Sequence, residues 1–258
     1  MKVVLPSLGA LGIKTVDLRE PKIKDLREIA NSNKIDSLIR LDLVKLLIDE
    51  KVSLDKITKY DSDYLFTIAA LSIQFNSLAY QLQCPHCKRQ IHTELNLEDK
   101  ELITLEDRKF PIKVVVNGVE RTYRLLSAQD EIDIVDYALS TDGDYQTLYE
   151  NMTVSKILSE PIENINELHS GTYLSALLFN QAMYHGIPTQ NKIQCPNCNK
   201  TVNVLMEPTS KMLPLSTTDL ISHFASVHDV LSFESFLDLT IPEFSTLIKS
   251  LNSRANAR

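Results

Sequence analysis

The sequence lacks the features that mark several classes of protein. It has no tryptophan, six glycines and ten prolines in 258 residues, whereas 43% of its residues are hydrophobic. This composition excludes collagen-like and low-complexity disordered chains. No stretch approaches the roughly 18 apolar residues that span a bilayer, and the N-terminal run MKVVLPSLGALG has no clear cleavage context. We therefore expect a soluble protein, made in a reducing cytoplasm, with one large core or two small ones.

Positive charge is also scarce. The chain has 27 Lys and Arg against 34 Asp and Glu, a formal net charge of −7. Such a chain repels phosphate backbones unless its basic residues are gathered on one face, and only small basic clusters such as Lys88 and Arg89 are visible. We therefore do not expect general nucleic-acid binding.

Catalytic motifs are missing as well. The sequence contains no G-x-G-x-x-G, P-loop, H-E-x-x-H or G-x-S-x-G pattern. The acidic stretches DEIDIVD, from Asp130, and TDGDYQ, from Thr141, are better interpreted as a solvated helix face and a turn. Asp142-Gly143-Asp144 is too short for a calcium loop. These observations predict a protein that is not an enzyme.

All four cysteines lie in two matching stretches. QCPHCKRQIHTEL begins at Gln83 and QCPNCNKTVNVLM at Gln194, and each continues into an alternating, strand-like run. The Cys-x-x-Cys spacing is typical of a zinc knuckle, in which two sulfurs bind one ion at about 2.3 Å. One knuckle supplies only two of the four ligands of a closed site. We therefore predict that one structural zinc ion per chain is shared by Cys84, Cys87, Cys195 and Cys198.

The long separation of the two pairs is a weak objection to a shared ion. Closing a loop of ~108 residues instead of a typical ~18 costs only about 1.6 kcal/mol more. A structural zinc ion contributes an apparent free energy on the order of 10 kcal/mol or more. The free energy of zinc binding therefore exceeds the cost of closing the longer loop, provided that the four sulfurs can surround one ion.

Three alternatives to a shared zinc ion stay open. Histidines could complete separate sites, although His223 and His228 lie far beyond Cys198 with an unfavourable i,i+5 spacing; the other candidates are His86 and His92. The pairs could be redox-active, yet neither leads directly into a helix that would lower a thiol pKa. The turns could also be metal-free hairpins.

Other segments repeat together with the cysteine turns. KTVDLREPKIKDLREIANS, from Lys14, resembles RTYRLLSAQDEIDIVDYALS, from Arg121, and DYLFTIAALSIQF, from Asp63, resembles TYLSALLFNQAMY, from Thr172. With the cysteines, the offsets are 107, 109 and 111 residues in the same order, although strand-helix patterns of this kind are common. We predict an α+β fold of two tandem units, each running strand, two helices, short loop, buried helix, strand, cysteine turn and strand.

The limits of the units follow from turn and cap signals. Asn117-Gly118 lies between two β-rich runs and predicts a type I′ hairpin, so we place the junction just before it, between Leu105 and Phe110. The predicted domains are 1–107, 108–208 and a C-terminal helical tail, 209–258. In the tail, Thr217, Thr218 and Asp219 could cap one helix, and Thr240, followed by Pro242, could cap another.

The segments VDLREPKIKDLREIA and VSLDKITKYDSDYLFTIAALSIQFNSLAYQLQCPHCKRQIHTELNLED resemble the T4-type bacteriophage baseplate hub family. The resemblance is best over about residues 14 to 100, and FLDLTIPEFSTLIKSL is similar to the C-terminal helix of such proteins. Here Glu20 separates an Arg and a Pro that are adjacent in the family pattern. The positions that carry the resemblance are Arg19, Pro21, Asp61, Tyr64, Leu65, Phe66, Cys84, Cys87, Leu97 and Asp99.

The resemblance implies a structural or assembly component of the tail baseplate hub. It implies a place in the virion after assembly in the host cytoplasm, and other baseplate and tail hub proteins as partners. The Asn117-Gly118 hairpin and apolar residues of the tail would contact those partners. The alternative for the apolar residues is packing on their own domain. These residues are Phe224, Leu231, Phe233, Phe236 and Leu237. The alternative function is a zinc-ribbon adaptor that binds nucleic acid or transcription machinery.

Overall fold

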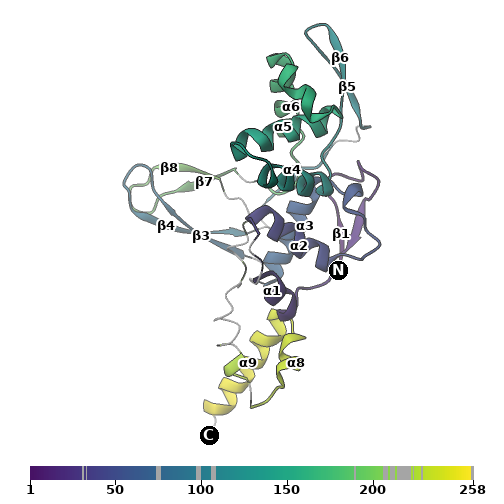
Figure 1. Cartoon of the computed structure of the whole chain (residues 1–258). Coiled ribbons are helices and arrows are strands. Elements are labelled where there is room, and N and C mark those ends of the chain that lie inside the picture. Colours follow the sequence, from purple (N-terminus) through teal and green to yellow (C-terminus); the bar gives the residue numbers. More distant parts are fainter. Residues whose placement is uncertain are drawn as a thin grey trace.

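The computed structural model describes residues 1–30, 32, 34–73, 77–96, 100–105, 109–188, 190–205, 209, 213, 222, 224–227 and 229–256. The fold is α+β, because a helical body carries small antiparallel hairpins (Figure 1). Within the described residues, every sheet consists of two strands.

The first half of the chain begins with a hairpin and ends with one. Three α-helices and a 3₁₀ helix lie between them. In order, the elements are β1 (Lys2–Val4), β2 (Thr15–Asp17), α1 (Ile23–Ala30), α2 (Asp36–Leu47), η1 (Leu54–Lys56), α3 (Lys59–Ile73), β3 (Ser77–Gln83) and β4 (Gln90–Asn96).

In the part of the chain that is described, the second half follows the same order of elements, and further helices come after it. The elements are β5 (Ile112–Val116), β6 (Val119–Tyr123), α4 (Ala128–Ser140), α5 (Tyr145–Leu158), η2 (Ile162–Glu167), α6 (Ser170–Ala182), β7 (Gln190–Gln194), β8 (Thr201–Leu205), α8 (Phe233–Leu237) and α9 (Ile241–Asn256).

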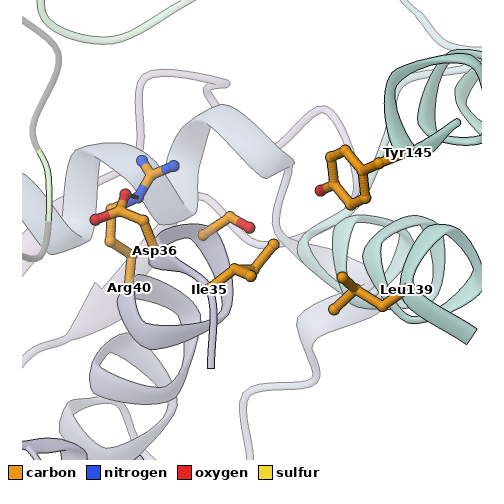
Figure 2. A pocket seen from close by; sticks show the side chains of 6 residues that line it. Ile35, Asp36, Arg40, Leu139 and Tyr145 are labelled. Carbon is orange, nitrogen blue, oxygen red and sulfur yellow. Dashed lines mark ion pairs between the residues drawn. The ribbon is translucent and has the colours of Figure 1, made fainter. Parts of the chain in front are cut away.

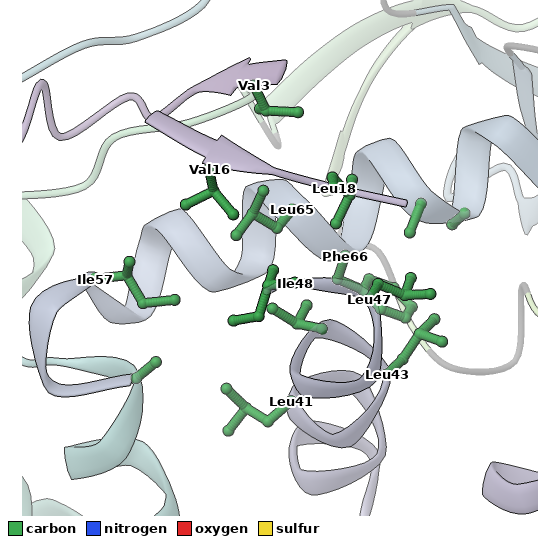
Figure 3. Packing of buried hydrophobic residues seen from close by; sticks show 14 of the residues in the cluster. Val3, Val16, Leu18, Leu41, Leu43, Leu47, Ile48, Ile57, Leu65 and Phe66 are labelled. Carbon is green, nitrogen blue, oxygen red and sulfur yellow. The ribbon is translucent and has the colours of Figure 1, made fainter. Parts of the chain in front are cut away.

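The first hydrophobic core is built around α3, which was predicted to be buried on most faces. Leu65 and Phe66 are fully buried, and Thr67 is 2% exposed. Figure 3 shows the α3 side chains between the β1–β2 hairpin, with Val16, and α2, with Leu47. Because helices contact α3 from more than one side, its apolar residues need no single stripe. The prediction of a buried helix is confirmed.

The second core lies between α4, α5, α6 and the β5–β6 hairpin. Its centre is Tyr123, which is fully buried, hydrogen-bonds Ser175 and lies edge-on to Phe179 with ring centroids 5.3 Å apart. The hairpin has the predicted tight turn, since φ is +53° at Asn117 and +78° at Gly118. The type I′ prediction is confirmed.

Buried polar contacts join the two halves. Lys59 Nζ at the start of α3 lies 2.8 Å from the Glu131 carboxylate of α4 and donates to Tyr149 OH of α5 at 2.7 Å. Burial alone would lower the pKa of Lys59, but Glu131 and Tyr149 raise it above its ordinary value. Nearby, the backbone N–H of Ala128 donates to Ile57 O at 3.0 Å. The halves therefore share a continuous interface.

The last two helices pack against α1, as Figure 1 shows. Phe236 is fully buried beside Ile23, so the hypothesis that it anchors a partner is wrong; the alternative, packing on its own domain, holds. Phe233 is 43% exposed. Three further side chains are partly buried against the same cluster: Phe224, Leu231 and Leu237.

The predicted cap at Thr240 is confirmed. Its hydroxyl accepts from the N–H of Glu243 at 3.3 Å, and the Glu243 carboxylate accepts from the Thr240 N–H at 2.8 Å. The other predicted helix start, at residues 217–219, lies outside the described residues. None of the helices described is both long and apolar enough to cross a membrane.

Candidate metal centre

The β3–β4 and β7–β8 hairpins extend together from the helical body as an arm (Figure 1), which comprises residues 77–96 and 190–205. Side chains alternate between the two faces of a strand. Paired residues on one face, Leu82 with Ile91 and Ile193 with Val202, pack in one cluster with the cysteines. Ile91 and Val202 are 3% and 5% exposed. This small apolar layer holds the two turns against each other.

The turn between β3 and β4 has the geometry of a knuckle. The N–H of Cys84 donates to Arg89 O at 2.9 Å, and the N–H of Lys88 donates to Cys84 O at 2.9 Å. Lys88 has a left-handed φ of +61°, and Gln83 Nε2 donates to its carbonyl at 2.9 Å. The chain thus turns tightly around the first cysteine.

The turn between β7 and β8 repeats each of these contacts. The N–H of Cys195 donates to Lys200 O at 3.0 Å, and the N–H of Asn199 donates to Cys195 O at 2.9 Å. Asn199 has a φ of +54°, and Gln194 Nε2 donates to its carbonyl at 3.3 Å. The similarity of the two sequences is therefore a similarity of backbone geometry.

The structure brings the four predicted ligands together. Cys84 Sγ lies 3.8 Å from Cys198 Sγ, Cys87 Sγ lies 3.7 Å from Cys195 Sγ, and all four sulfurs lie within 4.8 Å of one another. None is in a disulfide. A tetrahedral ion with sulfur ligands at about 2.3 Å requires sulfur atoms about 3.8 Å apart. Both short contacts, each between the two hairpins, fit that requirement.

The surroundings favour ionised sulfur at part of the cluster. The backbone amide of Cys87 lowers the pKa of Cys84, more than burial raises it. Burial raises the pKa of Cys195, but the amides of Asn197 and Cys198 and the sulfur of Cys84 together lower it to about 6. Such amide contacts stabilise thiolates, which are the form that binds metal.

The sulfur of Cys198 shows why an ion would be needed to ionise all four. The backbone amide of Lys200 lowers the pKa of Cys198, but burial and the neighbouring sulfurs of Cys195, Cys87 and Cys84 raise it to about 11. A divalent ion would offset the repulsion between adjacent thiolates. Four thiolates also close the coordination sphere, which is the arrangement of a structural site and not of a catalytic one.

The histidine alternative finds no support in the geometry. His86 and His92 are exposed, and the group of closely placed ligand atoms consists of the four cysteines alone in the part of the chain that is described. His223 and His228 lie outside that part. Both cysteine turns lead into strands, so no helix N-terminus lies directly after either pair.

Sequence reasoning missed the apolar layer and the two glutamines that support the turns. The alternation in QLQ, QIHT, KIQ and TVNV was the available signal for the layer, and Gln before each cysteine was the signal for the side-chain contacts. It also missed the contacts of Lys59 with Glu131 and Tyr149, which no local sequence pattern predicts.

A cavity lies between α2 and the α4–α5 junction. Figure 2 shows Ile35, Leu139 and Tyr145 facing this open space of about 650 Å³. Its charged residues are already paired, because Arg40 lies 3.1 Å from Asp36 and also pairs with Asp63. The cavity therefore offers an ion pair, the hydroxyl of Ser37 and apolar surface.

The acidic stretch from Asp130 is helical as predicted, but the prediction of a solvated face is wrong at its start. Asp130 and Glu131 are 7% and 5% exposed, because their carboxylates pair with Arg124 and Lys59. The stretch from Thr141 contains the predicted turn. Asp130 lies in the first turn of α4, where its carboxylate accepts from the N–H of Ser127 at 2.9 Å. Asp144 caps α5 by accepting from the N–H of Thr147 at 2.9 Å. Carboxylates at these positions accept hydrogen bonds from backbone N–H groups that have no acceptor within the helix. They also interact favourably with the helix dipole.

The fold and the cluster define an α+β protein in which two helical halves contribute two cysteines each to one four-sulfur cluster. The model of the T4 bacteriophage base plate protein family matches residues 1–214, and the chain belongs to this family. Searches of curated proteins and of solved structures found no match. The match confirms the resemblance and extends it over both halves. It ends before α8 and α9.

Family membership indicates a structural role in a bacteriophage tail. It also indicates a place in the virion tail and contact with other tail proteins. Proteins of this kind are in general not enzymes.

Proposed function

We propose that the chain is a non-catalytic structural or assembly component of the baseplate hub, built from two tandem copies of one unit and stabilised by zinc. The observation that carries the proposal is the convergence of two cysteine turns, one from each half, in a chain that belongs to a baseplate family. Its partners would be other hub proteins, met during assembly in the host cytoplasm.

A matched pair of ion pairs supports the tandem duplication. Arg19 holds Asp25 through two hydrogen bonds of 2.6 and 2.7 Å, and Arg124 holds Asp130 through two of 2.6 and 2.9 Å. In both, a backbone amide three residues before the carboxylate donates to it, at 2.7 and 2.9 Å. Each arginine follows a hairpin and each aspartate lies in the first turn of a helix.

These ion pairs support a different alignment at the start of the units. They are separated by 124 − 19 = 105 and 130 − 25 = 105 residues, instead of the 107 that aligned Leu18 with Leu125. The offset would then grow by 111 − 105 = 6 residues before the cysteines, and the greater length of α4 than of α1 would supply 13 − 8 = 5 of these.

The units 1–107, 108–208 and 209–258 remain our proposal for the domains. Two cores support the first two, and the cluster of Phe236 supports the third. The cores exchange residues, because Ala128 and Val135 lie in the first and Leu105 lies in the second. The limits would thus mark copied sequence units that fold together.

The zinc part of the proposal predicts about one ion per chain by elemental analysis. Replacing any one ligand, for example Cys84→Ser or Cys195→Ser, should remove it, since a closed site needs all four sulfurs. His86→Ala and His92→Ala are matched controls on the same hairpin and should retain the ion. Two ions per chain, or zinc retained in a Cys→Ser variant, would contradict a shared site.

The hub part of the proposal is tested in the phage. Disruption of the gene should prevent complete tails from forming, as seen by electron microscopy of lysates, and the intact gene supplied in trans should restore them. Affinity capture of the chain should recover tail hub proteins. Normal infectious tails without the gene would refute the proposal, whatever the metal content of the protein.

A further inference from the structure

We propose that the tip of the arm is a cationic surface that docks on the acidic helical segment of a second copy of this chain. The arm tip is defined as residues 81–93 and 192–204, and the acidic segment as residues 128–167. The proposal depends on how charge is distributed over the fold and does not require the hub assignment.

The arm tip contains only positive charge. Its charged residues are Lys88, Arg89, Lys192 and Lys200, and neither stretch contains a carboxylate. All four side chains are exposed. If zinc and four thiolates were present, the tip would still carry 4 + 2 − 4 = +2, with the cations outside and the sulfurs inside.

Among the described residues, no carboxylate pairs with the cations of the tip. The ion pairs found among the described residues do not include any of the four, and the one polar contact of Arg89, with Asn197 Oδ1, is long at 3.4 Å. Figure 1 shows the arm extending away from the helical body. Its tip is therefore positioned to meet another molecule.

The composition of the tip favours a protein over a nucleic acid. Single strands are held by aromatic side chains on which bases stack, and the two stretches of the tip contain no Phe, Tyr or Trp. A duplex would meet four cations on a chain whose net charge is −7, which weakens long-range attraction. An acidic protein surface fits better.

The chain itself supplies such a surface. Residues 128–167, which form α4, α5 and η2, contain ten Asp and Glu and one Lys, a net charge of 1 − 10 = −9. Some of these carboxylates are buried or paired, but Asp136, Asp142, Glu163 and Glu167 are exposed. The segment is more negative than the whole chain, so negative and positive charge are separated between the body and the arm.

Docking of a tip on an acidic segment uses two different surfaces of the same chain. Such a contact is heterologous, and its repetition gives a ring if the rotation closes and a filament if it does not. Opposite charges guide encounter, and salt screens them beyond about 8 Å at physiological ionic strength. Association should therefore be strongest at low salt.

The test is the oligomeric state of the full chain by sedimentation velocity, with salt and protein concentration varied. We expect species larger than a monomer at low salt and dissociation as salt is added. The tip variant Arg89→Glu/Lys192→Glu/Lys200→Glu should associate about 10-fold or more weakly. Lys88 is left unchanged because its left-handed φ belongs to the turn.

A charge exchange makes the test specific. The segment variant Asp136→Lys/Asp142→Lys/Glu163→Lys/Glu167→Lys should also be monomeric alone, because the four changes reduce the net charge of its segment from −9 to −9 + 8 = −1 and place four lysines on its exposed surface, which the positive tip would have to meet. Mixing it with the tip variant should restore association, since the unaltered positive tip of the segment variant then meets the unaltered acidic segment of the tip variant. Unchanged metal content and circular dichroism would verify that both variants fold.

Three outcomes would overturn the proposal. These are a wild-type chain that stays monomeric at low salt, association that survives reversal of the tip, and failure of the mixed variants to associate. Tighter binding of the tip to a short DNA duplex than to a second copy would instead identify nucleic acid as the partner, and would also overturn it.

Discussion

Replacement of Asp130 by Asn tests whether the Arg–Asp contacts at the helix starts stabilise the fold. The Asp130 carboxylate accepts two hydrogen bonds from Arg124, at 2.6 and 2.9 Å, and one from the N–H of Ser127 at 2.9 Å. Its side chain is 10% exposed. Asparagine has the same shape but no charge, so the guanidinium loses its counter-ion in a largely buried place.

The pKa of Asp130 sets the magnitude of the effect. Burial would raise that pKa, but the hydrogen bonds and charge of Arg124 lower it from 3.8 to about 2. A difference of 1.8 pKa units corresponds to about 2.4 kcal/mol as an upper limit. Arg124 is 32% exposed, so water screens part of the attraction. We expect the free energy of unfolding to fall by about 1–2 kcal/mol.

The same contact predicts a change in acid sensitivity. Because the pKa is lower in the folded state than in the unfolded state, the carboxylate stabilises the fold fully above about pH 5. This stabilisation is lost as the pH falls through 3.8 towards 2. The Asp130→Asn variant should therefore differ most from the wild type at neutral pH and least near pH 2.

Asp25→Asn is the matched variant in the other half. Asp25 has hydrogen bonds of 2.6 and 2.7 Å from Arg19, so a similar loss of about 1–2 kcal/mol is expected. The two losses should add to within about 0.5 kcal/mol in the double variant, since the sites share no partner. Urea unfolding measures all three. A loss below about 0.3 kcal/mol, or an unchanged pH profile, would refute the reasoning.

Three further outcomes are expected. Phe66→Ala should cost about 3–5 kcal/mol in thermal unfolding because the ring is fully buried, whereas Leu174→Ala, at a side chain that is 56% exposed, should change stability by about 0.5 kcal/mol or less. Gly118→Ala should cost about 1–2 kcal/mol because φ is +78°, even though no atom lies near an added Cβ; an unchanged midpoint would contradict this. Burial lowers the pKa of His185, so the unfolded state binds a proton at this residue more readily than the folded state does. The free energy of unfolding should therefore decrease as the pH falls below about 6.5. A His185→Asn variant should lose this contribution to the pH dependence of stability.

Local signals in the sequence predicted several features of the fold. Asn117-Gly118 predicted a type I′ turn because only residues that tolerate positive φ fit it, and Thr240, followed by Pro242, predicted the cap of a helix. The cysteine turns were predicted from the Cys-x-x-Cys spacing, and in the structure a residue with left-handed φ follows the second cysteine of each turn. Such features depend on a few consecutive residues.

Contacts between distant segments could not be predicted in this way. The hydroxyl of Thr58 lies 2.6 Å from His185 Nε2, and His185 Nδ1 lies 2.8 Å from Met183 O, all in a buried place. Lys59 meets Glu131, which lies 131 − 59 = 72 residues further along the chain. Polar residues at helix starts are usually explained by capping alone, so their second role appears only when the halves are packed together.

The position of the cysteine cluster limits what a bound ion could stabilise. The cluster lies in the arm, where it packs with the apolar layer of the two hairpins. The halves are joined separately in the helical body, by the ion pair of Lys59 with Glu131 and by the hydrogen bond from the Ala128 N–H to Ile57 O. Removal of metal by a chelator should therefore separate the hairpins and leave the two helical cores folded. Trypsin should then cut faster at Lys88 and Lys200, in the turns, while the helical circular dichroism persists. Collapse of the helical signal on chelation would mean that the ion holds the halves together, because a purely local clamp could not unfold cores with which it shares so few contacts.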